Sequence, residues 1–200
     1  MSTRMSAPER REQILDATRD LSWERGFHAL TIDGVARAAG ITRPIVYSHF
    51  GDLSGLLHAV VDREGERATA QLASLLPTDL GPDPRERLLG ALKAFLEAVR
   101  AEPIRWRLIL MPPEGAPEIL RSRFERERAA VTAQLATVVG PALESIPGER
   151  SPDAELLARS LQAFAEELAR VTLAEPDRYP VEHILDYARW ALRLFAIEPS

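Results

Sequence analysis

The chain has 200 residues, of which 46% are hydrophobic, and its 25 basic and 30 acidic side chains give a formal net charge of −5. This much apolar sequence excludes global disorder and suffices for a buried core. Cysteine is absent, which excludes disulfides and thiolate metal sites and favours a reducing cytoplasm. The first residues lack the apolar segment of a secretory signal, and no apolar run approaches the roughly 18 residues of a membrane span. We therefore expect a soluble cytoplasmic protein.

Apolar residues recur at helical spacing along the chain, and no alternating pattern indicates a strand. We therefore expect an all-α fold of about nine helices, separated by segments rich in proline and glycine. The expected helices span residues 8–26, 32–39, 43–49, 52–76, 83–101, 103–111, 116–139, 152–175 and 180–196. The expected loops span residues 74–86, 111–117, 140–153 and 174–180.

The first fifty residues carry the signals of three short helices around a small core. Thr31 and Thr42 suit the N-cap positions of the second and third helices, where a hydroxyl can accept a hydrogen bond from a free backbone N–H. Gly40 suits the position after the second helix, and Pro44 falls in the first turn of the third, where its missing N–H costs nothing. The expected core residues of this unit are Ile14, Leu15, Thr18, Leu21, Val35, Ala36, Ala39, Ile41, Val46 and Phe50.

Two helices joined by a turn of three or four residues that contains glycine form the helix-turn-helix pattern, which places its second helix in the major groove of DNA. Residues 32–49 match this pattern. Arg43 can donate two hydrogen bonds to guanine. Thr42, Tyr47, Ser48 and His49 can donate to phosphates or contact thymine methyl groups. The alternatives are that Tyr47 and His49 belong to the core, and that Arg43 is merely solvated.

The negative net charge of the chain does not exclude a DNA partner. Residues 1–50 contain seven arginines and six acids, a net charge of +1. Residues 51–200 contain 18 bases and 24 acids, a net charge of −6, so the acidity belongs to the C-terminal part. A nearly neutral segment can still bind phosphates if its arginines gather on one face.

The segment "LTIDGVARAAGITRPIVYSHFGDLSGLLHAV" resembles the N-terminal signature of the TetR (tetracycline repressor) family of transcriptional regulators, from about Ile14 to Val60. The resemblance implies base contacts near Arg43, Pro44 and Ser48. It also implies phosphate or backbone contacts from Thr31, Thr42, Tyr47 and His49. The residues that carry it are Gly26, Phe27, Thr31, Val35, Ala36, Ala39, Gly40, Ile41, Tyr47, His49, Phe50, Leu56 and Leu57.

One residue departs from the family pattern. The family usually has a lysine three residues after the phenylalanine, where it meets a phosphate, and this chain has Leu53 there. The backbone N–H groups at the start of the following helix can still face a phosphate. We expect weaker nonspecific DNA affinity and a shallower salt dependence than in a lysine-bearing relative.

The resemblance implies two domains, a DNA-binding domain over residues 1–51 and a helical effector-binding and dimerisation domain over residues 52–200. It also implies dimerisation through the last two helices, each of which carries apolar residues at helical spacing. Helix 180–196 has a second apolar face with Tyr187, Trp190 and Leu194, and the alternative is that both faces are internal core. The expected dimer residues are Leu157, Leu161, Leu168, Ile184, Ala188, Ala191 and Phe195.

Residues 94–117 mix aromatic residues and methionine with Arg105 and Arg107, and such residues are more often core than pocket. If an effector pocket lies in the C-terminal domain, its expected apolar lining is Phe95, Trp106, Leu110, Phe124 and Phe164.

Nothing in the sequence predicts catalysis, a cofactor or a metal site. The histidines at positions 28, 49, 58 and 183 lack the spacing of metal ligands, and no nucleophile elbow, P-loop or dinucleotide fingerprint occurs. We therefore expect a homodimeric repressor that binds a palindromic DNA operator and leaves it when a small molecule binds. The alternatives are a helical small-molecule carrier or enzyme with a vestigial helix-turn-helix, and a transcriptional activator.

Overall fold

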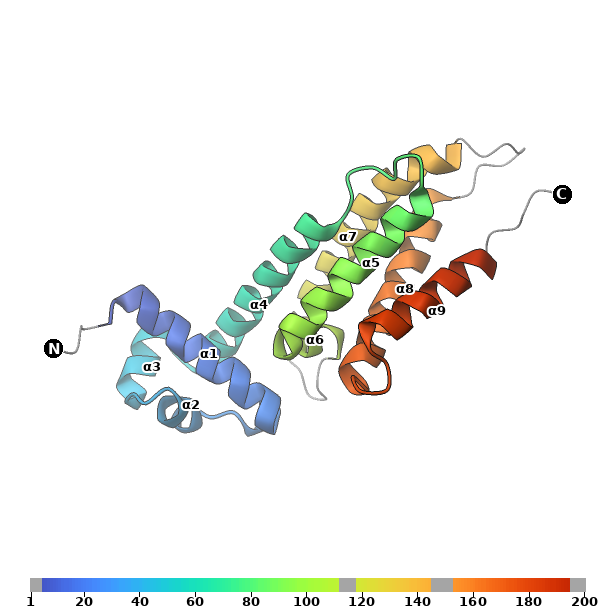
Figure 1. The fold of residues 1–200 in the computed structure, drawn as a ribbon. Coiled ribbons are helices and arrows are strands. Elements are labelled where there is room, and N and C mark those ends of the chain that lie inside the picture. Colours follow the sequence, from blue (N-terminus) through green and yellow to red (C-terminus); the bar gives the residue numbers. More distant parts are fainter. Residues whose placement is uncertain (1–4, 112–117, 145–152, 195–200) are drawn as a thin grey trace.

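The computed structural model describes residues 5–111, 118–144 and 153–194, and every regular element within these ranges is helical (Figure 1). This confirms the predicted all-α fold. The helices are α1 (Ala7–Arg25), α2 (Ile32–Ala38), α3 (Arg43–Phe50), α4 (Leu53–Leu75), α5 (Pro84–Ala101), α6 (Pro103–Leu110), α7 (Glu118–Glu144), α8 (Ala154–Ala174) and α9 (Val181–Leu194), with a short 3-10 helix, η1 (Phe27–Ala29). No helix in the described ranges combines the length and hydropathy needed to cross a bilayer.

The helices form an elongated molecule. α1, α2 and α3 gather at one end, and α4 leads from them into a bundle with α5, α7, α8 and α9 (Figure 1). The short helix α6 lies at the end of this bundle that contacts α1.

The N-terminal core joins α1, α2, α3 and the first half of α4. Its fully buried members include Ile14, Val35, Val46 and Leu56. Leu108 of α6 belongs to the same core, so the N-terminal helices pack directly against the larger bundle. Burial of an aliphatic side chain contributes roughly 1.5–3 kcal/mol to the stability of the fold. This shared core therefore holds α3 in a defined position relative to the larger bundle.

The caps of the first helices follow from local sequence. Ser6 and Glu9 form a capping box at the start of α1, and the hydrogen bonds from Ser6 lower the pKa of the Glu9 carboxyl below its usual range. The Thr31 hydroxyl accepts from the Gly34 N–H at 3.0 Å, as predicted.

Thr42 occupies the predicted N-cap position of α3, but its side chain makes no capping hydrogen bond. Gly40 in the intervening turn has φ of 64°, a value that costs a non-glycine residue steric strain.

The expected loop over residues 140–153 is wrong in its first part. α7 continues through Gly140 and Pro141 to Glu144, although proline removes one helical hydrogen bond. Val139 and Leu143 on either side of the proline are buried. Their packing offsets the weak local propensity. Residues 145–152 lie outside the described part of the chain.

Candidate nucleic-acid interface and effector cavity

One side of α3 faces solvent as a continuous polar row. Thr42, Arg43, Pro44 and Ser48 are exposed and Tyr47 is 50% exposed, whereas Val46 on the opposite side is fully buried. Tyr47 therefore does not belong to the core, which removes that alternative. His49 is partly buried and Thr31, at the start of α2, is exposed. The structure thus brings six of the seven predicted DNA-contact residues onto α3 and its N-cap, with the seventh at the N-cap of α2.

Arg43 is ion-paired in the free chain. Its Nε contacts the carboxylate of Asp33 in the first turn of α2, and both side chains are well exposed. Exposed pairs contribute only about 0–1 kcal/mol, whereas a bidentate contact to guanine discriminates by about 1–3 kcal/mol. Arg43 can therefore exchange Asp33 for a base. The sequence does not reveal the role of Asp33, because its proximity to Arg43 depends on the angle between α2 and α3.

Contacts from α1 hold the turn and the C-terminal end of the helix-turn-helix. The Arg11 guanidinium lies 4.6 Å from the centroid of the Phe50 ring, and its Nη1 donates to the His49 carbonyl at 3.4 Å. The Gln13 amide donates to the carbonyl of Ala39 at 3.0 Å. Such fixed supports limit how far α3 can tilt on its own.

Leu53, the residue that departs from the family pattern, is partly buried against the N-terminal core. Asp52 precedes it as the N-cap of α4 and accepts from the Gly55 N–H at 2.7 Å. The start of α4 therefore presents an acidic cap and an apolar side chain where a basic one is usual in the family.

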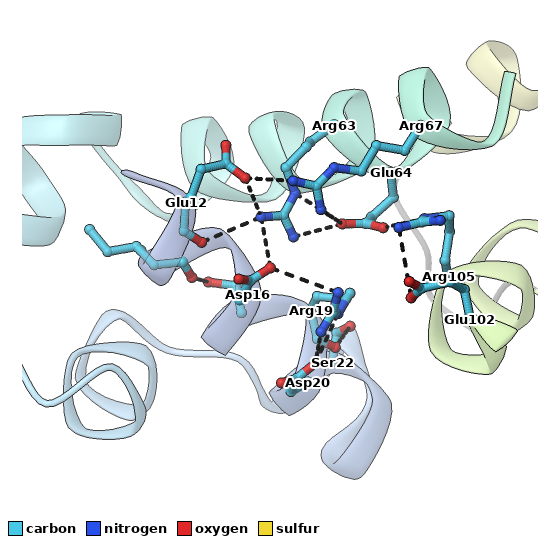
Figure 2. Close-up of polar contacts among 12 residues, drawn as sticks. Glu12, Asp16, Arg19, Asp20, Ser22, Arg63, Glu64, Arg67, Glu102 and Arg105 are labelled. Carbon is cyan, nitrogen blue, oxygen red and sulfur yellow. Dashed lines mark hydrogen bonds and ion pairs between the residues drawn. The ribbon is translucent and has the colours of Figure 1, made fainter. Parts of the chain in front are cut away.

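A buried ion cluster centres on Glu64 of α4, whose side chain has no exposed surface (Figure 2). Its Oε1 accepts from Nε and Nη2 of Arg63 at 2.9 and 2.6 Å. Its Oε2 accepts from Nε of Arg105 in α6 at 2.9 Å. One carboxylate thus joins α4 to α6.

The same cluster reaches α1. Nη1 of Arg63 lies 3.1 Å from Glu12 and 2.9 Å from Asp16, and Nη2 of Arg67 lies 2.7 Å from Glu12 (Figure 2). These residues connect the N-terminal unit to α4 and, through Glu64, to α6. The sequence does not reveal this cluster. Arg63 and Glu64 are buried, whereas the similar pair Glu66 and Arg67 in the same helix is exposed, and no pattern distinguishes the two pairs.

Arg107, two residues after Arg105, makes a second connection from α6. Its guanidinium lies 4.4 Å from the centroid of the Trp23 ring in α1, and its Nη2 donates to the Leu173 carbonyl in α8. Trp106, between the two arginines, is 1% exposed and lies against Phe95 with ring centroids 5.2 Å apart. α6 therefore contacts α1, α4, α5 and α8 through three consecutive side chains.

A cavity of about 330 Å³ lies within the bundle. This volume falls within the range of about 300–1,000 Å³ that is typical of small-molecule sites. Residues from α4 to α9 line it. All five residues predicted from sequence as pocket lining are among them, namely Phe95, Trp106, Leu110, Phe124 and Phe164.

The predicted dimer residues lie mostly inside the single chain. Leu168, Ile184, Ala188 and Ala191 belong to its buried core, where intramolecular packing leaves them no surface for a partner. The prediction that these four residues form the dimer interface is therefore corrected: they belong to the core of the single chain. Leu157 and Leu161 are partly buried against α7, and Phe195 lies outside the described residues.

The outward apolar surface of α8 and α9 lies on a neighbouring face. Leu156 of α8 and Tyr187 and Trp190 of α9 are exposed. The rings of Phe164 and Tyr187 have centroids 6.3 Å apart, and those of Tyr187 and Trp190 are 6.0 Å apart. The sequence predicts this second apolar face of α9. Helical periodicity alone does not show which of the two faces packs inside the chain.

In the described ranges, no group of three or more histidine or acidic side chains is placed to hold a metal ion. The exposed second helix of a helix-turn-helix, mounted on a helical bundle with an apolar cavity, defines a helix-turn-helix transcriptional regulator.

Comparison with known proteins gives the family. Residues 14–60 match the sequence profile of "Bacterial regulatory proteins, tetR family". The chain is 31% identical to the HTH-type transcriptional regulator AlkX of Mycobacterium tuberculosis, over 76% of this chain and 70% of that protein. It is 33% identical to the HTH-type transcriptional activator FasR of Mycolicibacterium smegmatis, over 53% of this chain and about half (48%) of that protein.

A solved structure agrees with this comparison. The TetR-like regulator from Rhodococcus sp. RHA1 superposes with a TM-score of 0.74 at 28% identity, over 98% of this chain and 100% of that one. The chain therefore belongs to the TetR family and is a transcriptional regulator, which confirms the resemblance seen in its sequence.

Proposed function

We propose that this regulator acts in the cytoplasm as a homodimer, that its two α3 helices bind a near-palindromic DNA operator, and that a small-molecule effector releases it. Residues 1–51 would form the DNA-binding domain, and residues 52–200 the effector-binding and dimerisation domain. The exposed polar row of α3 on its fixed support carries the proposal. Selection of fragments from random duplex DNA, with and without candidate ligands, tests it.

Base discrimination is expected to depend on Arg43. Changing Arg43 to alanine should relax the preference at one base position of each half-site by about 1–3 kcal/mol. Arg87 of α5 is a matched control, because it is also an exposed arginine paired with an acid, Asp79. The measurement is binding to a set of single-base operator variants. An equal loss on every variant would show that Arg43 contacts only phosphate.

Restoring the family's lysine is expected to strengthen the electrostatic part of binding. Leu53→Lys should add one phosphate contact per subunit and steepen the salt dependence by about one counterion per subunit. Gln134→Lys, an exposed position on α7, adds the same charge away from α3 and controls for net charge. Titrations of one duplex at several salt concentrations give the slopes, and equal slopes for the two variants would refute this account of Leu53.

We propose that α6 transmits the effector's presence to α3. Trp106 lines the cavity, while Arg105 binds Glu64 of α4 and Arg107 stacks on Trp23 of α1. An effector that favours a different position of α6 changes its contacts with both α4 and α1. The effector shifts the equilibrium only as far as its affinities for the two states differ.

We propose that the partner subunit covers the outer face of α8 and α9 at Leu156, Tyr187 and Trp190. Exposed aromatic residues of this kind are enriched in interface cores. A two-fold dimer would place two α3 helices about one turn of DNA apart, at two half-sites of a near-palindrome.

An activator is the second candidate, because FasR carries that name. It would use the same DNA contacts and differ in where its operator lies relative to a promoter. A reporter assay decides between them, since deletion of the regulator raises expression from a repressed promoter and lowers it from an activated one.

A further inference from the structure

We infer that the effector is an uncharged, mostly apolar molecule with a hydrogen-bond donor, such as a hydroxyl group, and that this donor binds the carboxylate of Glu166. The inference rests on the proposed role of the cavity as the effector site.

The body of the ligand must be apolar because most of the cavity lining is. α4 and α5 contribute Leu72, Leu92 and Phe95, and α6 and α8 contribute Trp106 and Phe164. Removing such surface from water favours a complex with an apolar ligand.

One wall of the cavity carries a chain of buried polar groups. The Thr132 hydroxyl donates to Oε1 of Gln162 at 2.6 Å, and Nε2 of Gln162 donates to Oε1 of Glu166 at 2.9 Å. The Gln162 amide thus accepts one hydrogen bond and donates another within this chain of groups. Glu166, which is 7% exposed, can still accept, because a carboxylate has about four acceptor positions.

The position that remains open on Glu166 is on Oε2. Arg128 approaches the carboxylate with Nε at 2.9 Å from Oε1 and Nη2 at 2.7 Å from Oε2. Oε1 thus accepts from both Arg128 and Gln162, while the nearest further nitrogen to Oε2, Nη1 of Arg170, is 3.8 Å away. A donor on the ligand can bind Oε2 without displacing a protein group.

The charges along the cavity disfavour an anionic ligand. Three of the described lining residues are acidic and two are basic. Arg128 is paired with Glu166, and Nε of Arg170 donates to Glu167 at 3.0 Å. A ligand carboxylate beside Glu166 would meet the like charge of that carboxylate, and both arginines already have an acidic partner.

The indole N–H of Trp106 is a donor without a described partner, but its nitrogen has almost no accessible surface. A ligand acceptor cannot reach it without a shift of its neighbours. Glu166, in contrast, lines the cavity with an acceptor position left on Oε2, and this favours a donor on the ligand.

Two matched pairs of probes test the inference on the full chain without DNA. They are 1-decanol against decanoate and 4-phenylphenol against 4-phenylbenzoate, measured by calorimetry at neutral pH. The wild-type chain should bind the hydroxyl member of at least one pair about tenfold to a hundredfold more tightly than its carboxylate counterpart. Equal or tighter binding of the carboxylates, or binding of neither hydroxyl probe, would overturn the inference.

Glu166→Gln should reverse the preference for the hydroxyl probe over the carboxylate probe. The substitution removes the negative charge at position 166 and frees Arg128 to bind a carboxylate. Glu167→Gln is the control, since Glu167 is exposed and does not line the cavity. If Glu166→Gln does not fold, the wild-type comparison still decides.

A separate assay adds a selected duplex to the protein with each probe and measures how much DNA stays bound. Tight hydroxyl binding that leaves DNA bound would uphold the ligand class and refute effector release. Release by a carboxylate would uphold the function and overturn the ligand class.

Discussion

Replacing Glu64 with alanine is expected to lower the free energy of unfolding by about 3–5 kcal/mol, the cost of removing one partner from a buried ion pair. Glu64 has no exposed surface, and it is the common partner of Arg63 and Arg105. Without it, two buried guanidinium groups lose their strongest acceptor. Chemical denaturation at fixed protein concentration measures the effect, because the stability of an oligomer depends on concentration.

Glu97→Ala is the matched control for this prediction. Glu97 also pairs with a basic residue, Lys93, but both side chains are more than half exposed, so the expected loss is within about 0.5 kcal/mol. A loss at Glu64 as small as that at Glu97 would show that the cluster does not stabilise the junction of α1, α4 and α6.

The function of the cluster can be separated from its contribution to stability. Replacing Arg63, Glu64 and Arg105 together with apolar residues of similar volume is expected to recover stability, because no buried charge is left unpaired. If the cluster carries the effector's signal, this variant should bind DNA and ligand but lose the coupling between them.

Trp190→Ala is expected to weaken the dimer by about 2–4 kcal/mol, the range of strong interface residues. Trp190 is 55% exposed in the single chain and lies beside Tyr187 on the outer face of α9. A two-fold interface contains this residue twice, so one substitution removes two contacts. DNA affinity should fall as well, because each half-site would then bind without the other. Sedimentation equilibrium measures the first effect and titration of a selected duplex the second.

Trp23→Ala is the control for the dimer prediction. Trp23 is a tryptophan of similar exposure on α1 and not on the outer face of α9, so its loss should leave the dimer unchanged. An unchanged dimer in Trp190→Ala would rule out the outer face of α9 as the interface.

The helix-turn-helix was predictable because its signals are local. Thr31, Gly40 and Pro44 each specify a cap, a turn or a first helical turn by their own chemistry, and the structure places each where the sequence predicts. The five aromatic and aliphatic residues expected in a pocket do line one cavity, because large apolar side chains at helical spacing converge in a bundle.

Burial that results from the packing of several helices could not be predicted from the sequence. Glu64 is buried because α1 and α6 cover that side of α4, and no pattern within α4 shows it. The internal face of α9 is determined by packing against α5, so Ala188 is buried and Trp190 is exposed. Pro141 remains helical since its neighbours are buried, which outweighs its low propensity.

The most direct test of the central claim is the stoichiometry of the regulator on duplexes selected from a random pool in the absence of ligand. The account predicts an enriched inverted repeat, with half-sites about 10 base pairs apart and two chains on each duplex. One chain per duplex, or enrichment of no sequence at low salt, would contradict it.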